Sequence, residues 1–158
     1  MKILLTLISL LAIFSSASIQ AASDCILEMN GRWSLNPETS LDPEELQFEV
    51  LVFTNTENEQ RYAMEFENGP DDKGSLDWSV LCDGEDHPSP DFPWSTSENA
   101  TVAISRLGDK SEFVVQKEDG ILTTTYTRVL ADNDQTMISV GRDAVGKIVW
   151  VRVFDRED

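Results

Sequence analysis

Short runs of alternating apolar and polar residues make up most of the chain from residue 31 to the C-terminus. In one of these runs, Tyr62, Met64 and Phe66 alternate with polar neighbours. A period of two is typical of strands with one buried face, and we find no convincing amphipathic helix in this part of the chain. The runs that predict strands are 31–35, 47–54, 60–67, 76–82, 101–107, 111–117, 121–130, 136–141 and 147–154.

Turn residues separate these runs, and late in the chain the connections are short. Asp119-Gly120 is a strong signal for a tight hairpin, and Gly108-Asp109 separates the two runs before it. Sequential hairpins predict an all-β, antiparallel up-and-down sheet, and closing such a sheet into a barrel of about nine strands removes its exposed edges. A two-sheet β-sandwich is the alternative, but its crossovers would need longer connections.

The segment 83–100 interrupts this pattern with Pro88, Pro90 and Pro93. Because proline donates no ladder hydrogen bond, we expect no ordered strand pairing there. The only histidine of the chain, His87, lies in this segment, and we interpret it as an exposed loop residue. The chain therefore lacks a clear general base for nucleophilic catalysis, and an enzyme is the interpretation with the least support.

Apolar and aromatic residues at alternating positions are the candidates to line one interior. That interior either packs solid or holds one small ligand, because a small barrel is just wide enough for either. The residues that we predict to face it are Phe48, Val50, Val52, Tyr62, Met64, Phe66, Trp78, Val102, Ile104, Phe113, Val115, Tyr126 and Trp150. Among them, the candidate ligand contacts are Tyr62, Met64, Phe66, Trp78, Tyr126 and Trp150.

The first 22 residues have the pattern of an export signal. Lys2 precedes an apolar run over residues 3–14, and small residues follow up to Ala22. We expect residues 1–22 to be a signal peptide and residues 23–158 to form one domain that works in the periplasm or outside the cell. No later run approaches the roughly 20 apolar residues of a spanning helix, so we expect no membrane span.

Composition adds two constraints. The chain carries 29 acidic and 12 basic residues, a net charge of −17, which disfavours nucleic acid and leaves a cationic protein as a possible partner. The two cysteines, Cys25 and Cys82, would form one disulfide in an oxidising compartment. Their spacing and the single histidine do not predict a metal site, and we expect neither a metal nor a cofactor.

Several short motifs resemble those of bacterial secreted lipocalin-like proteins. These motifs are Gly31-x-Trp33-x-Leu35-Asn36 with Ser40, Asp83-Gly84-Glu85-Asp86-His87-Pro88, Thr127-Arg128-Val129 and Asp143-Ala144-x-Gly146-Lys147. The chain differs from the family pattern by having Glu85 in place of lysine and His87 in place of tyrosine, and by its two cysteines. The resemblance implies a calycin-type barrel of about eight to ten strands around an interior suited to a small apolar ligand.

The same resemblance gives structural roles to a few residues. Gly31 and Trp33 belong to the motif that closes the base of the barrel, where the family stacks an arginine from a late strand on the tryptophan. Arg128 and Arg152 are the candidates for that arginine. A guanidinium on an indole face gains about 1 kcal/mol and can bind exposed carbonyl oxygens.

These observations predict a binding protein without catalytic activity, which holds a small apolar or amphipathic molecule. The alternative is an acidic interaction module or inhibitor that docks on a cationic extracellular protein. Salt distinguishes the two, because charge-driven docking weakens as ionic strength rises, whereas apolar burial does not.

Overall fold

The computed structural model describes residues 24–41, 50–65, 75–89 and 97–157. The predicted signal peptide, Phe48 and Phe66 lie outside these ranges. The described chain forms ten strands and one short 3₁₀ helix. The elements are η1 (Leu27–Met29), β1 (Gly31–Leu35), β2 (Val50–Phe53), β3 (Glu59–Glu65), β4 (Ser75–Leu81), β5 (His87–Pro88), β6 (Ala100–Gly108), β7 (Ser111–Glu118), β8 (Ile121–Leu130), β9 (Thr136–Asp143) and β10 (Ile148–Arg156).

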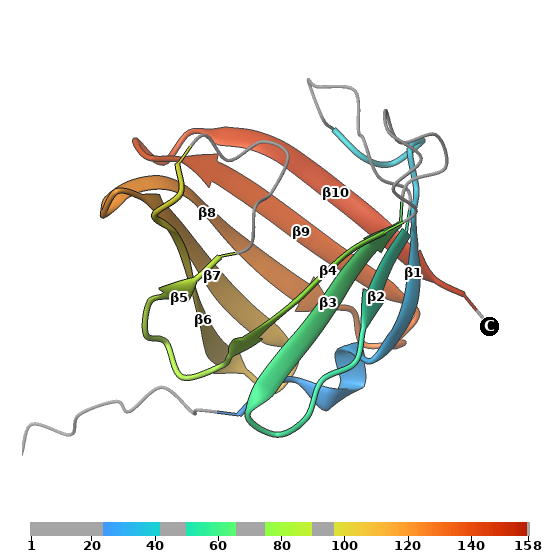
Figure 1. Cartoon of the computed structure of the whole chain (residues 1–158). Helices are drawn as coiled ribbons and strands as arrows, with labels where there is room; N and C mark the ends of the chain where they lie inside the picture. The colour runs from blue at the N-terminus through green and yellow to red at the C-terminus, as the bar shows by residue number, and fades with distance from the viewer. Residues whose placement is uncertain (1–23, 42–49, 66–74, 90–96, 158) are drawn as a thin grey trace, which may run out of the picture.

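All ten strands belong to one antiparallel sheet that curls into a nearly closed barrel (Figure 1). Consecutive strands are hydrogen-bonded to each other everywhere except between β4 and β5. Strand β1 pairs with β10 as well as with β2, which joins the two ends of the chain. The sheet ends at β4 and β5, which are not hydrogen-bonded to each other over the described residues. The fold class that we predicted is confirmed, and the sandwich alternative is not needed.

The tightest predicted hairpin forms as expected. Asp119 and Gly120 adopt φ angles of 50° and 76°, and their neighbours Glu118 and Ile121 are paired across the turn. Two consecutive residues with positive φ match the right-handed twist of a hairpin.

The prediction that no pairing occurs between residues 83 and 100 is wrong at one point. His87 and Pro88 form β5 and pair with Val102 and Thr101 of β6. Proline is tolerated there because β5 is an edge strand whose other side needs no ladder hydrogen bond. The His87 ring lies 2.8 Å from Asp83 Oδ1, and this contact holds the pKa of the Asp83 carboxyl below its usual range.

Four of the residues that we predicted to face the interior point outward. Residues paired across a ladder share a face, and Trp33, which is fully buried, pairs with Leu51. The inward residues of β2 are therefore Leu51 and Phe53, and Val50 and Val52 lie on the outer surface. By the same criterion Val114 faces inward with Tyr126, which places Phe113 and Val115 outside. These strands have apolar residues on both faces, so alternation alone could not assign the buried one.

Candidate functional site

One end of the barrel, which we call the sealed end, is closed by η1, Trp33 and Arg156. The Trp33 indole is fully buried and its Nε1 donates a hydrogen bond to the Met29 carbonyl oxygen at 2.8 Å. The Arg156 guanidinium lies 4.2 Å from the centre of the Trp33 ring. It also donates to the carbonyl oxygens of Asn30 and Asp134, each at 2.7 Å. Both polar groups of this stack are thus satisfied, the indole in a fully buried position and the guanidinium in a partly exposed one.

The arginine on Trp33 is Arg156, and it is neither of the two that we expected. Register explains the difference, because β1 and β10 are aligned so that Trp33 lies opposite Arg156. Arg152 lies four residues earlier on β10, and Arg128 faces the middle of the barrel. Gly31, with a φ of +131°, lies beside the stack, and a Cβ there would come within 3.0 Å of Arg156 Nη1.

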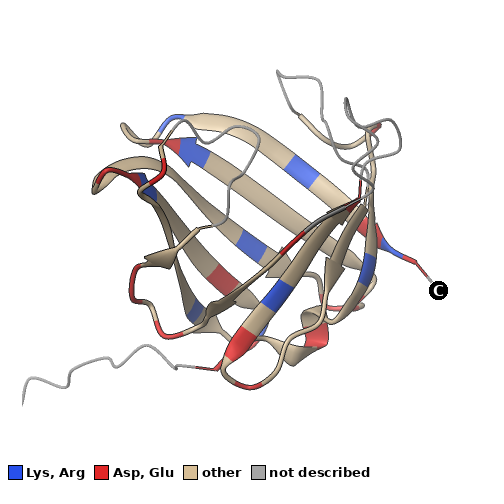
Figure 2. Ribbon diagram, viewed as in Figure 1, with Lys and Arg blue, Asp and Glu red and all other residues tan. Residues whose placement is uncertain are grey.

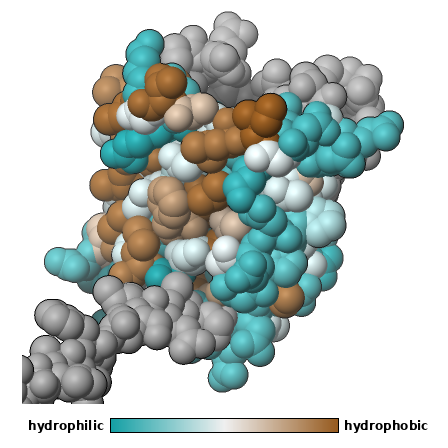
Figure 3. All heavy atoms as spheres, turned by 90° about the vertical axis from the view of Figure 1, so that its left-hand side faces the viewer, coloured by the Kyte–Doolittle hydropathy of each residue, from teal (hydrophilic) through white to brown (hydrophobic). Residues whose placement is uncertain are grey.

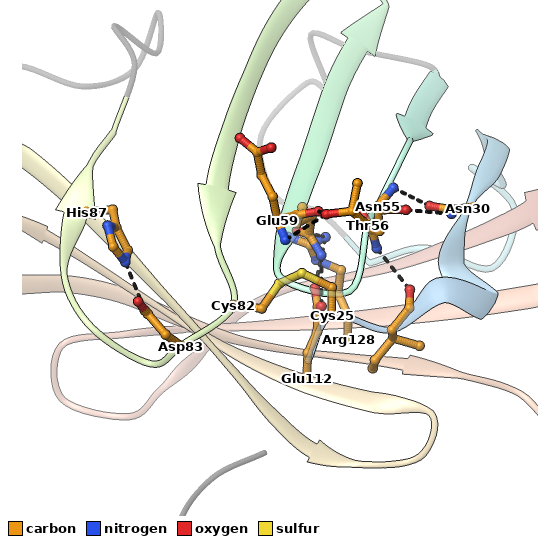
Figure 4. The surroundings of a disulfide bond; sticks show 12 residues. Cys25, Asn30, Asn55, Thr56, Glu59, Cys82, Asp83, His87, Glu112 and Arg128 are labelled. Carbon is orange, nitrogen blue, oxygen red and sulfur yellow. Dashed lines mark hydrogen bonds and ion pairs between the residues drawn. A yellow bond between two sulfur atoms is a disulfide. The ribbon is translucent and has the colours of Figure 1, made fainter. Parts of the chain in front are cut away.

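The N-terminal segment is fastened to the barrel near this end. A disulfide joins Cys25 to Cys82, at the end of β4 (Figure 4). Asn30 and Asn55 bind each other through side chain and backbone, and Asn55 Nδ2 donates to the Ile26 carbonyl oxygen at 2.9 Å. The predicted disulfide is confirmed, and its place shows that it ties the segment carrying η1 to the end of the edge strand β4.

A buried polar cluster crosses the middle of the barrel. Arg128 Nη1 lies 3.0 Å from Glu112 Oε1, and the two side chains are only 2% and 1% exposed. Gln60 bridges them, since its Nε2 donates to Glu112 at 2.9 Å and its Oε1 accepts from Arg128 at 3.3 Å. Arg128 Nη2 donates to the Tyr126 hydroxyl at 3.1 Å. Sequence reasoning missed Glu112 and Gln60. A charged or amide residue at an inward-facing strand position would have indicated a buried polar contact.

Aromatic rings surround the same guanidinium. The centres of the Phe53, Tyr62 and Tyr126 rings lie 5.0, 5.2 and 5.1 Å from Arg128 Cζ. Burial by itself would lower the pKa of Arg128, but Glu112 and the tyrosines outweigh it, and the pKa lies above its ordinary value. Burial raises the pKa of Tyr62. Arg128 is therefore a charged and internally bonded part of the core.

The opposite end of the barrel, which we call the far end, is where β8 and β10 begin. There the Trp150 ring lies against the backbone of Gly141, where a Cβ would come within 2.1 Å of the indole. The Arg152 guanidinium is 4.4 Å from the Trp150 ring centre, and the Tyr126 ring is 5.6 Å away. Glycine at position 141 thus lets a flat aromatic surface form inside the barrel wall. Nothing in the local sequence around Gly141 predicted this contact.

Inward side chains become more exposed from the sealed end to the far end. Trp33, Phe53, Leu130 and Met137 are at most 2% exposed. At the far end the inward residues are only partly buried; these are Leu35, Gln116, Thr124, Trp150 and Arg152. Over the described part of the chain, the interior is packed at one end and partly accessible at the other.

The predicted ligand contacts fall into two groups across the interior. Tyr62 and Trp78 meet edge to face with ring centres 5.3 Å apart, and Met64 lies buried on the same face of β3. Tyr126 and Trp150 form the second group, on β8 and β10. Arg128 lies between the groups, because it contacts both tyrosines. Whether these residues touch a ligand stays a prediction.

The described residues contain no group of three or more His, Cys, Asp or Glu side chains arranged to hold a metal ion. None of their helices is long and apolar enough to cross a membrane.

No protein-family model and no curated protein matches the chain. Among solved structures, it is similar to the crystal structure of zebrafish ileal bile acid-binding protein complexed with cholic acid. The TM-score is 0.52 at 10% sequence identity, over 82% of this chain and 99% of that chain. The fold is lipocalin-like. At this identity the likeness establishes the fold alone, and the narrower resemblance to bacterial secreted proteins stays a prediction.

Proposed function

We propose that this chain is an exported protein that holds a small apolar or amphipathic molecule at the far end of the barrel. The main support is the exposure gradient of the inward side chains, which leaves Trp150 partly accessible while Trp33 is fully buried. Zebrafish ileal bile acid-binding protein, which has a similar fold, is complexed with cholic acid.

The contacts at the far end indicate how such a molecule would bind. Its apolar part would lie on the rings of Trp150 and Tyr126, and a polar group would point to Arg152, whose guanidinium already lies over Trp150. Arg128 would take no direct part, because Glu112, Gln60 and Tyr126 already bind its guanidinium. Burying apolar surface contributes about 25 cal/mol per Å² before ordering costs, so micromolar affinity is feasible.

Export is supported by two separate observations. The first 22 residues have the composition of a signal peptide. The Cys25–Cys82 disulfide suits an oxidising compartment such as the periplasm or the extracellular space.

Tryptophan fluorescence tests the binding proposal. Cholic acid, fatty acids, isoprenoids and haem would be titrated against the exported protein at low and high salt, and we expect at least one to bind in the micromolar range. Trp150→Phe should change the response and weaken binding, whereas the control Trp33→Phe, at the sealed end, should keep the affinity. If no compound binds better than about 1 mM and a basic protein associates in a salt-sensitive way, the docking module is the better function.

A further inference from the structure

The outer surface of β7 to β10 is mostly apolar over three successive rows of cross-strand neighbours, with apolar residues at eight of the twelve positions. In the central row Phe113, Thr127, Val140 and Val151 are paired in turn. The rows on either side complete the surface. We call it the apolar outer face, and it consists of Phe113, Val115, Val129, Ile138, Val140, Ile148, Val151 and Val153.

Several of these side chains are exposed although they are large and aliphatic. Val129, Ile138 and Ile148 are 41%, 38% and 53% exposed. Leu41, whose backbone is bridged to Val151, extends the face and is 72% exposed. Single exposed aliphatic residues are normal, but a contiguous set on neighbouring strands marks an interaction surface.

The outer surface on the other side of the barrel differs sharply. There the Arg61 guanidinium pairs with Asp77 at 2.5 Å, and Arg32 pairs with Glu65 at 2.6 Å. Figure 2 shows acidic and basic positions on β3, at the front of the view. In Figure 3, hydrophobic residues gather on the side that carries the rear strands of Figure 1, and hydrophilic residues on the side that carries β3 and β4. Over the described residues, the outer surface of β7 to β10 therefore has few of the charges that keep the surface around β3 and β4 in water.

Charge decides which partner fits the apolar outer face. A cationic protein needs carboxylates and an anionic bilayer needs basic residues, but the three rows contain a single charged side chain, Arg142, at their border. The net charge of −17 also repels anionic lipid. A second copy presents the same charge-poor surface, and a two-fold interface pairs a patch with itself. We propose that two copies of this chain associate through their apolar outer faces, independently of any ligand.

The geometry fits a weak dimer. Four strands spaced about 4.8 Å apart and three rows about 6.7 Å apart give a face of about 14 by 13 Å between Cα positions. Two such sheets can stack about 10 Å apart with their side chains interdigitated. This Cα footprint is far smaller than the roughly 800 Å² that each partner buries in a stable complex, so we expect the dimer to be weak and transient.

Salt gives this dimer a distinctive signature. Both copies are strongly acidic, so their general repulsion opposes association at low ionic strength and is screened as salt rises. Apolar burial is not screened. The dimer should thus become tighter at high salt, which is opposite to the behaviour of acidic protein docked on a cationic partner.

Sedimentation equilibrium of the exported protein over a range of concentrations tests the proposal at about 0.02, 0.15 and 0.5 M salt. We expect a monomer–dimer equilibrium whose dissociation constant falls as salt rises. Ile138→Lys should raise that constant at least tenfold at every salt concentration, although it reduces the negative charge of the chain. The matched control is Ser79→Lys, which makes the same charge change at an exposed site on β4 and should leave the dimer unchanged or slightly tighter.

Three outcomes would overturn the proposal. One is a protein that stays monomeric at all concentrations and salts. Another is self-association that Ile138→Lys and Ser79→Lys affect equally while both variants keep the wild-type unfolding midpoint. The third is a monomer that phosphatidylcholine vesicles capture in the wild type but not in Ile138→Lys, which would assign the face to a lipid surface.

Discussion

The two ends of the barrel carry the same pair of residue types in different surroundings. At each end an arginine of β10 stacks on a tryptophan, Arg156 on Trp33 at 4.2 Å and Arg152 on Trp150 at 4.4 Å. At the sealed end, Trp33 is fully buried and hydrogen-bonded, and Arg156 binds three backbone carbonyl oxygens. At the far end, Trp150 is only partly buried. The same contact thus forms part of a rigid seal in one place and part of an accessible wall in the other.

Each stack also rests on a glycine. Gly31 leaves room for the Arg156 guanidinium, and Gly141 leaves room for the Trp150 indole. The difference between the ends therefore lies in what covers the stack. At the sealed end η1 brings the Met29 carbonyl oxygen to Trp33 and the Asn30 carbonyl oxygen to Arg156.

The largest expected effect separates the two tryptophans. Trp33→Ala removes a fully buried indole and should destabilise the protein by about 3 to 5 kcal/mol through lost burial and an unfilled cavity. Trp150→Ala should cost clearly less, because its ring is only partly buried, and should instead weaken ligand binding. Chemical denaturation of both variants gives the comparison. Equal losses of stability would show that the far end is packed as firmly as the sealed end.

A second prediction concerns the polar cluster between the ends. Glu112→Leu leaves the Arg128 charge buried without its carboxylate partner, and removing one partner of a buried pair costs about 3 to 5 kcal/mol. Replacing both residues, with Glu112→Leu and Arg128→Met, removes the uncompensated charge and should recover most of that loss. A double variant less stable than the single one would mean that Arg128 stabilises the barrel without Glu112, through Gln60, Tyr126 and the surrounding aromatic rings.

The sequence was informative at several places where the determinants are local. The turn at Asp119-Gly120 and the strand Gly31–Leu35 follow from a few neighbouring residues, and the structure confirms both. The choice of arginine for Trp33 depends on the register between β1 and β10, which are more than 100 positions apart. No local pattern encodes such a register, and the chain has arginines at 128, 152 and 156.

The inward face was ambiguous for a different reason. On β7 the outward residues Phe113 and Val115 are as apolar as the inward Val114, so hydrophobic alternation cannot distinguish the faces. On β3 the outward Arg61 makes the assignment easy, and the inward Tyr62 and Met64 were predicted correctly. Prediction failed on β2 and β7, where both faces of the strand are apolar, and the outward residues of β7 are part of the surface that we assign to a second copy.

A third prediction tests how far the sealed end depends on its covalent tie. Replacing Cys25 and Cys82 by serine frees the segment that carries η1 and should destabilise the protein by about 2 to 4 kcal/mol. Ligand binding by the folded fraction should persist, because Trp150 and Arg152 lie at the other end.

Thiol titration of the unreduced, denatured parent protein should detect no free thiol, because the two cysteines of the chain are bridged. Two reactive thiols per chain would contradict the Cys25–Cys82 disulfide.

The smallest expected effect comes from an exposed ion pair, which Arg61 and Asp77 form on the charged outer surface. Surface pairs contribute little because water and salt screen them, so Arg61→Ala should shift the unfolding midpoint far less than the changes at either end.

The hydrogen bond from Arg61 holds the pKa of Asp77 below its usual range. This contribution is therefore present above the ordinary carboxyl pKa, and it disappears as the pH falls through the lowered value and Asp77 binds a proton. Denaturation of wild type and Arg61→Ala between pH 7 and pH 2 should give curves that converge in acid. If the gap stays constant down to the lowest pH, Arg61 stabilises the sheet by packing its aliphatic stem rather than by its charge.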